Sequence, residues 1–151
     1  MLLKIIMTPS ESIKNKIKKF EGLCLTATRC SAGVPTIGFG HTGPEVRMGQ
    51  KISRQKADEI FDQDISKFSE GVDMLFPEGI PQCRFDALVS FAFNCGLGAL
   101  QKSTLLKMIK ANPENPDIKK EFMKWVHAAG RRLPGLVKRR AMEADHYFGI
   151  I

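Results

Sequence analysis

The sequence contains no long apolar run. Its opening residues, MLLKIIM, supply only a handful of apolar positions before Thr8-Pro9, too few for the core of a signal peptide, and no small-residue cleavage site follows. No later run approaches the ~18 apolar residues that a membrane-spanning helix needs. We therefore expect a protein with no export signal of its own and no stable association with a membrane.

Metal-binding patterns are also missing. The four cysteines, Cys24, Cys30, Cys83 and Cys95, include no CxxC pair and no matching histidine spacing, which argues against a zinc site. We expect neither a metal nor an organic cofactor. Cys83 and Cys95 flank an apolar segment and are expected to behave as small buried side chains. The spacing of Cys24 and Cys30 permits a disulfide without requiring one.

Acidic residues are in the minority. The chain has 23 Lys and Arg against 16 Asp and Glu, a net charge of +7, which favours a polyanionic partner such as nucleic acid, a membrane surface or a cell wall. No nucleic-acid motif and no interleaved aromatic residues accompany the charge, so we expect no nucleic-acid partner. Much of the charge lies in one C-terminal cluster, which can also be interpreted as a solvated helix face without a binding role. The cluster consists of Arg131, Arg132, Lys138, Arg139 and Arg140.

The length of 151 residues and the hydrophobic share of 43% predict one globular domain over residues 1–151. We also expect a monomer, although the sequence itself leaves oligomerisation open. Residues 24–50 hold several glycines and no helical periodicity, so they predict a small β lobe. Residues 8–22 and 53–151 are predicted to be helical. The expected helices cover 8–22, 53–75, 81–95, 103–110, 117–129 and 136–148.

The first expected helix ends in a candidate catalytic acid. Thr8 is the expected cap, with Glu11 completing a capping box and Gly22 ending the helix. Glu21 follows Ile17 by four positions and lies near the negative end of the helix dipole. Burial and the dipole both disfavour a charged carboxylate there, as a general acid requires. The competing interpretation is a surface glutamate at a frayed helix end.

Four separated segments carry a family resemblance. They read FEGLCL, PTIGFGHT, ALVSFAFNCGLGALQKSTLL and, after Trp125, AAGRRLPGLVKRRAMEA. With these motifs in this order, the chain resembles the phage-type lysozymes or endolysins, the muramidases of glycoside hydrolase family 24. The resemblance implies an α+β, lysozyme-like fold with a small β-hairpin lobe, a predominantly helical C-terminal lobe and a cleft between them.

The resemblance also implies an activity. The family hydrolyses the β-1,4 bond between N-acetylmuramic acid and N-acetylglucosamine in peptidoglycan, so peptidoglycan glycan strands are the expected partner. The implied setting is lysis of a bacterial host, with the enzyme made in the host cytoplasm and admitted to the periplasm and wall by a holin. A bacterial effector lysozyme is an alternative, and so is a wall-binding module without catalysis.

By resemblance, the catalytic residues are Glu21, Cys30 and Thr36. The family pattern is Glu, Asp nine residues later and Thr six after that, and Cys30 departs from it at the Asp position. The implied roles are proton donation by Glu21, water positioning by Thr36 and support of the transition state by the middle residue. Arg29 and the basic C-terminal segment would favour a Cys30 thiolate. The alternatives are that Cys30 only fills space, or that a disulfide with Cys24 switches the enzyme off.

The resemblance further implies substrate-binding residues. His41 follows the glycine-rich hairpin, and a structural hydrogen-bonding role for it competes with a role as general base. Trp125 shares a stripe with Ile118 and Phe122, so we interpret it as core rather than as a sugar platform. The expected substrate-binding positions are His41, Thr42, Phe93, Asn94, Ser103 and Thr104.

Overall fold

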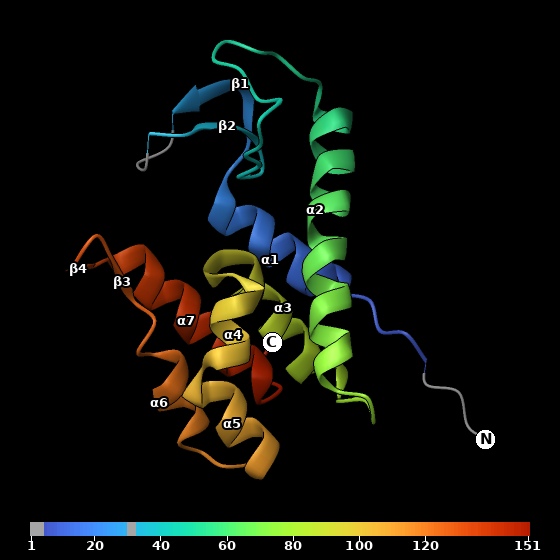
Figure 1. Cartoon of the computed structure of the whole chain (residues 1–151), viewed down its shortest axis with the longest axis vertical. Coiled ribbons are helices and arrows are strands. Elements are labelled where there is room, and N and C mark those ends of the chain that lie inside the picture. Colours follow the sequence, from blue (N-terminus) through green and yellow to red (C-terminus); the bar gives the residue numbers. More distant parts are fainter. Residues whose placement is uncertain (1–4, 30–32) are drawn as a thin grey trace. The chain divides into compact units, whose positions relative to one another are not determined.

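The computed structural model describes residues 5–29 and 33–151 (Figure 1). It has the expected α+β class, with a β-hairpin near the N-terminus followed by mostly helical segments. The chain divides into two compact units, one formed by Lys14–Lys67 and the other by Met1–Ile13 with Phe68–Ile151. In order, the elements are α1 (Glu11–Glu21), β1 (Cys24–Arg29), β2 (Pro35–Gly38), α2 (Arg54–Leu75), α3 (Gln82–Cys95), α4 (Leu97–Lys102), α5 (Thr104–Ala111), α6 (Ile118–Phe122), β3 (His127–Ala128), β4 (Arg131–Arg132) and α7 (Pro134–Tyr147).

Helix α1 begins two residues later than a Thr8 cap predicts. Ser10 is the cap, because its Oγ accepts a hydrogen bond from the backbone N–H of Ile13 at 3.2 Å. The expected end is confirmed: Gly22 has a φ of 74° and its N–H donates to the Lys18 carbonyl at 2.9 Å. The helix therefore ends on Glu21, the candidate acid.

The Lys14–Lys67 unit is built on the hairpin of β1 and β2 (Figure 1). The strands are antiparallel, with Cys24 opposite Gly38 and Thr28 opposite Thr36. The other edge of β1 is paired too, since Ala27 N–H donates to the Gln50 carbonyl at 2.7 Å. A small apolar core fills the lobe with Ala27, Ile37, Val46 and Ile52.

Helix α2 starts as the sequence predicts, because Ser53 Oγ accepts from Lys56 N–H at 3.0 Å. Its first half holds α1 through one lysine. Lys18 Nζ lies 3.1 Å from Asp58 Oδ1 and stands 5.0 Å from the centre of the Phe61 ring and 5.2 Å from that of Phe39. The Lys18 side chain thus links α1, the hairpin turn and α2 within this unit.

Helix α3 is the central buried helix that its apolar sequence predicts. All its residues from Phe85 to Ala92 are buried, and it packs on α4 and α7 (Figure 1). Asp86 lies within this buried stretch and accepts hydrogen bonds from Ser10 Oγ at 2.5 Å, Gln82 at 2.8 Å and His146 at 3.1 Å. One carboxylate therefore joins the segment before α1, α3 and α7.

One helix prediction is wrong, and one helix was not predicted individually. The helix expected over 117–129 ends at Phe122, because Ala129 and Gly130 adopt φ values of 51° and 75° and close a short hairpin of β3 and β4 instead. Residues 97–102, which lie between two of the individually expected helices, form the additional helix α4: Gly96 takes the bend with a φ of 94°, and Leu100 of the new helix is buried. No helix in the described residues is long and apolar enough to span a bilayer.

Candidate active site

Glu21 is held at the end of α1 against a glycine turn. Gly40 has a φ of 72°, and a Cβ placed there would lie 3.1 Å from Glu21 Cδ and closer still to Oε1. Two backbone hydrogen bonds of 2.9 Å between Ile37 and His41 close this turn. The glycine in PTIGFGHT therefore leaves room for the half-buried Glu21 carboxylate, since any side chain at that position would displace it.

Thr36 lies on β2, just before the same turn. Its Oγ1 donates to the Val34 carbonyl at 3.0 Å. Because a hydroxyl has one donor and two acceptor lone pairs, this bond directs the proton of Thr36 to the backbone and leaves its lone pairs to accept. Thr36 is thus set to accept a hydrogen bond from a water molecule.

Cys30 lies outside the described residues, and so do the predictions made for it. Its neighbour Arg29 is described, and the Arg29 guanidinium donates to the Gly33 carbonyl at 3.0 Å. Cys24 Sγ donates to the Thr26 carbonyl at 2.7 Å. Within the described segments, no group of His, Cys, Asp and Glu side chains is arranged to hold a metal ion.

His41 is fixed by two carboxylates. Its Nδ1 lies 2.7 Å from Asp64 Oδ2 on α2, and its Nε2 lies 2.7 Å from Glu45 Oε1. Burial lowers the pKa of the ring, but the hydrogen bonds to Glu45 and Asp64 outweigh burial and hold the pKa above 6.5. Because both ring nitrogens are engaged by carboxylates, the geometry favours the structural role over that of a general base. Thr42, which follows, is exposed.

The other expected binding residues belong to the helical unit. Asn94 and Thr104 are exposed, whereas Phe93 is half-buried against Phe68, with ring centres 5.3 Å apart. Ser103 is only 5% exposed and caps α5: its Oγ donates to the Leu100 carbonyl at 2.7 Å and accepts from Leu106 N–H at 3.0 Å. The geometry gives Ser103 a capping role, and contact of these four residues with substrate stays a prediction.

The basic C-terminal segment is not uniformly a solvated face. Arg131 and Arg132 are exposed on β4, but Arg139 and Arg140 are buried. Arg140 Nε lies 2.8 Å from Glu143 Oε1, and Arg139 Nε lies 3.4 Å from Oε2 of the same residue. Burial raises the pKa of the Glu143 carboxyl, and the two guanidinium groups oppose that effect.

Cys95 also departs from the expectation of a small buried side chain. It is half-exposed, and its Sγ accepts a hydrogen bond from Arg140 Nη1 at 2.6 Å, while Arg140 Nη2 donates to Asn94 Oδ1 at 2.6 Å. Cys83 is likewise half-exposed and contacts the Tyr147 carbonyl at 3.5 Å. Sequence reasoning missed the link from Arg140 to Asn94, because the two residues are 46 positions apart.

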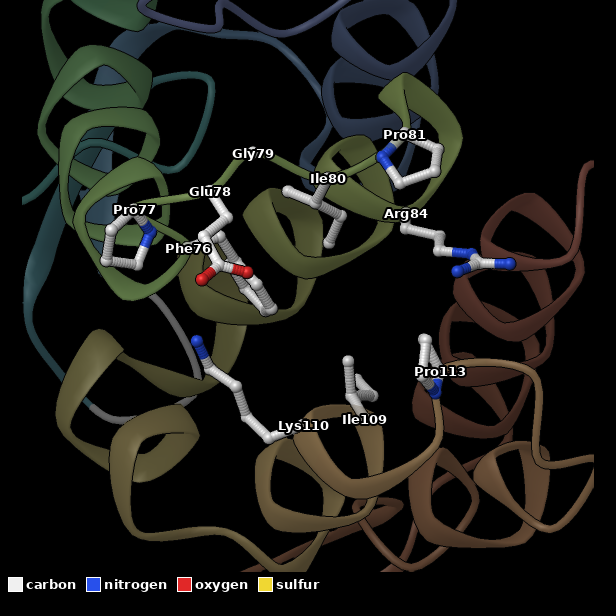
Figure 2. Close-up of a pocket in the computed structure, with 10 residues that line it drawn as sticks. All are labelled: Phe76, Pro77, Glu78, Gly79, Ile80, Pro81, Arg84, Ile109, Lys110 and Pro113. Carbon is white, nitrogen blue, oxygen red and sulfur yellow. The ribbon is translucent and has the colours of Figure 1, made fainter. Parts of the chain in front are cut away.

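None of the expected site residues lines a pocket of about 400 Å³ in the helical unit (Figure 2). Ile80 and Ile109 lie between its charged ends, which are marked by Lys110 and Arg84 (Figure 2). Both cations have structural contacts: Lys110 donates to the Leu75 carbonyl and stands 4.2 Å from the Phe76 ring centre, and Arg84 covers the Tyr147 ring at 5.5 Å. We therefore place the candidate site at Glu21 and the glycine turn.

Comparisons with known proteins identify the family. The family model described as phage lysozyme matches residues 18–143. The endolysin of Bacillus phage B103 is 44% identical over 91% of this chain and 52% of its own length, and that of Bacillus phage PZA is 39% identical over 91% and 54%. The chain thus spans about half the length of these two relatives. The structure of an endolysin from Escherichia coli O157:H7 phage FAHEc1 superposes with a TM-score of 0.87 and 35% identity, covering 99% of this chain and 98% of that one.

Proposed function

Because the chain belongs to the phage lysozyme family, we propose that it is an endolysin that hydrolyses the β-1,4 bond between N-acetylmuramic acid and N-acetylglucosamine in peptidoglycan. The observation that carries the proposal is the position of Glu21. The acid ends α1 and faces a turn that only a glycine can form without displacing it. This turn directly follows β2, the strand that carries Thr36, which supports a site that uses both residues.

The proposed reaction uses one acid and one water. Glu21 donates its proton to the glycosidic oxygen as the bond to the anomeric carbon breaks. Water then adds to that carbon and releases one proton to the solvent, from which the Glu21 carboxylate is reprotonated. Thr36 positions the water by accepting one of its hydrogens, since its own hydroxyl proton is directed to the Val34 carbonyl. His41 supports the turn through Asp64 and Glu45 rather than exchanging a proton with substrate.

Cys30 completes the proposed Glu-Cys-Thr variant of the catalytic triad. A thiolate at this position would stabilise the positive charge that develops on the sugar ring, whereas a neutral thiol would contribute little. The adjacent Arg29 supplies a cation that favours the thiolate. Cys30→Ala, assayed under reducing conditions, should therefore lower kcat, and activity equal to that of the original chain would assign Cys30 a space-filling role.

A wall-binding module without catalysis is the second candidate function. The departure from Asp at position 30 motivates it, and the exposed Arg131 and Arg132 would contribute attraction to an anionic wall. Such a protein would sediment with peptidoglycan and release no new reducing ends.

The deciding experiment measures turbidity and reducing ends of purified peptidoglycan at low salt. Glu21→Gln should abolish clearing, and Glu59→Gln, the same chemical change on an exposed glutamate of α2, should leave it intact. Clearing that survives Glu21→Gln would overturn the assignment of the acid. Sedimentation with the wall in the absence of any cleavage would favour the binding module.

The proposed biological setting is lysis of a bacterial host. The enzyme is made in the cytoplasm, reaches the periplasm through a holin and acts there as a monomer. An effector lysozyme delivered by a bacterium is the alternative. Expression in a host with and without a co-expressed holin, followed by culture density, tests the setting: lysis that does not depend on the holin would contradict it.

A further inference from the structure

The glycine turn that faces Glu21 carries one bulky side chain, Phe39. Its neighbours Gly38 and Gly40 have φ values of 65° and 72°, which a glycine adopts as readily as many other values. The two glycines therefore allow the shape of the turn but do little to hold it. Phe39 is only 5% exposed, so its ring is the part of the turn that the rest of the Lys14–Lys67 unit can hold.

The ring of Phe39 is held by the ammonium group of Lys18. Lys18 Nζ stands 5.2 Å from the centre of the Phe39 ring and 5.0 Å from that of Phe61, and the two rings meet edge to face with their centres 5.7 Å apart. A cation is attracted to an aromatic ring more strongly when both are shielded from water. The Lys18 side chain is 21% exposed, so its ammonium group holds Phe39 and Phe61 together in a mostly buried position.

The ammonium group is itself kept in place by Asp58 of α2. Asp58 Oδ1 lies 3.1 Å from Lys18 Nζ and 3.4 Å from Arg54 Nε. The hydrogen bond from Lys18 is the main cause that lowers the pKa of the Asp58 carboxyl. Arg54 also stands over the Phe39 ring, at 5.4 Å from its centre. One carboxylate therefore holds two cations against the same ring, and the position of that ring depends on both α1 and α2.

Lys18 and Glu21 meet the turn at adjacent residues. They are three positions apart on α1, so their side chains project from the same side of the helix. Lys18 contacts Phe39, and Glu21 lies against Gly40, where an added Cβ would be 3.1 Å from Glu21 Cδ. These two contacts together fix both the distance and the direction of the turn relative to the end of α1.

We propose that Lys18 is a positioning residue for the reaction: it acts through Phe39 to keep the glycine turn against the Glu21 carboxylate. The effect on catalysis rests on the proposed function, whereas the hold on the turn does not. Without the ammonium group, the turn and the carboxylate beside it would sample more orientations, and a displacement of about 1 Å at a reacting group costs roughly 10²-fold in rate. Binding of the glycan strand does not depend on this contact, so kcat should fall while KM changes little.

Lys18→Met keeps the apolar stem of the side chain and removes the ammonium group. Measured as release of reducing ends from solubilised peptidoglycan, kcat should fall by about tenfold or more, with KM changed by less than about twofold. Lys14→Met is the matched control. Lys14 lies one turn earlier on α1, is 23% exposed and pairs with Asp62 of α2 at 3.7 Å, but it is not among the cations that stand over Phe39 in the described residues. Both variants lose an ion pair between α1 and α2, so their thermal midpoints should fall by similar amounts. Equal kcat values for the two variants would overturn the proposal.

Two further variants test whether Lys18 acts as a cation and through the ring. A guanidinium can also pair with Asp58 and stand over an aromatic ring, so Lys18→Arg should restore kcat close to that of the original chain. A loss as large as that of Lys18→Met would show that a cation is not what holds the turn. In a Phe39→Leu background, Lys18→Met should cause no further loss of kcat, because the ring is already absent. Equal fold losses in both backgrounds would overturn the proposal.

Backbone NMR separates this proposal from the proposed function. The amide signals of Phe39 and Gly40 should shift or broaden in Lys18→Met and stay in place in Lys14→Met, whether or not the chain cleaves peptidoglycan. Unchanged signals in Lys18→Met would overturn the proposal and leave the assignment of Glu21 as the acid untouched. The expected shifts in a chain that cleaves no peptidoglycan would support the hold on the turn and refute the proposed function alone.

Discussion

Gly40→Ala tests the central geometric claim, that a glycine turn holds the acid. The new methyl group would lie 3.1 Å from Glu21 Cδ and 3.5 Å from Cγ, and closer still to Oε1, so the carboxylate must move by about 1 Å. A displacement of that size at a reacting group costs roughly 10²-fold in rate. Because alanine is strained at the left-handed φ of 72°, the substitution also lowers the free energy of unfolding by roughly 1–2 kcal/mol.

Gly49→Ala is the matched control for this experiment. Gly49 lies in the same unit with a φ of 81°, so the backbone penalty is similar, but a Cβ added there would have no atom within 4 Å. Urea unfolding should show comparable destabilisation of both variants. Release of reducing ends from peptidoglycan should fall about 10²-fold for Gly40→Ala alone. Equal activity of the two variants would refute the argument that the turn positions Glu21.

Three further predictions concern stability. The hydrogen bonds to Glu45 and Asp64 raise the pKa of His41 above its ordinary 6.5. The stabilisation that the charged His41 gives the folded state is therefore complete below pH 6.5 and is lost as pH rises through the folded-state pKa. In His41→Asn, the free energy of unfolding measured with urea should no longer decline in this way above pH 6.5. A variant with the same pH profile as the original chain would contradict the prediction. Burial raises the pKa of Asp86, but hydrogen bonds from His146 and Ser10 outweigh burial and hold the pKa below 3.8. Asp86→Ala should therefore lower the free energy of unfolding at pH 7 by about 2–5 kcal/mol and weaken its decline as pH falls below 3.8, measured by urea unfolding. Ser53→Ala should lower the free energy of unfolding by about 0.5–2 kcal/mol through loss of the cap of α2, and an equal loss for Ser66→Ala, the same change at an exposed site in the middle of α2, would argue against the cap.

The helix ends that could be predicted are those marked by a capping residue or a glycine within one turn of the end. Ser53 and the apolar repeat after it define α2, and Gly22 defines the end of α1, because caps and left-handed glycines act within one turn. The prediction of a helix over 117–129 was wrong because no such local signal marks where this helix ends. Trp125 and Val126 continue the helical spacing, and only the positive φ values at Ala129 and Gly130 reveal the hairpin.

Only the part of the candidate site that has a clear local sequence signal, the glycine turn, could be predicted. PTIGFGHT signalled a turn, and the structure shows that Gly40 faces Glu21, which lies nineteen positions earlier. The carboxylate partners of His41 were not predictable. Asp64 comes from the middle of α2, where an acidic residue on a long helix gives no sign of which side chain it meets.

The two arginines near the C-terminus show why charge patterns are weak predictors of exposure. Arg139 and Arg140 continue a basic run, and such runs are usually solvated, yet these two are buried because Glu143 follows them by one helical turn and α3 supplies Ser90 and Asn94. A buried arginine needs partners on every side, and those partners lie on a helix far away in sequence. The arrangement therefore becomes visible only when α3 and α7 are packed. That packing places a rigid donor behind Asn94, where sequence alone shows only the end of an apolar helix.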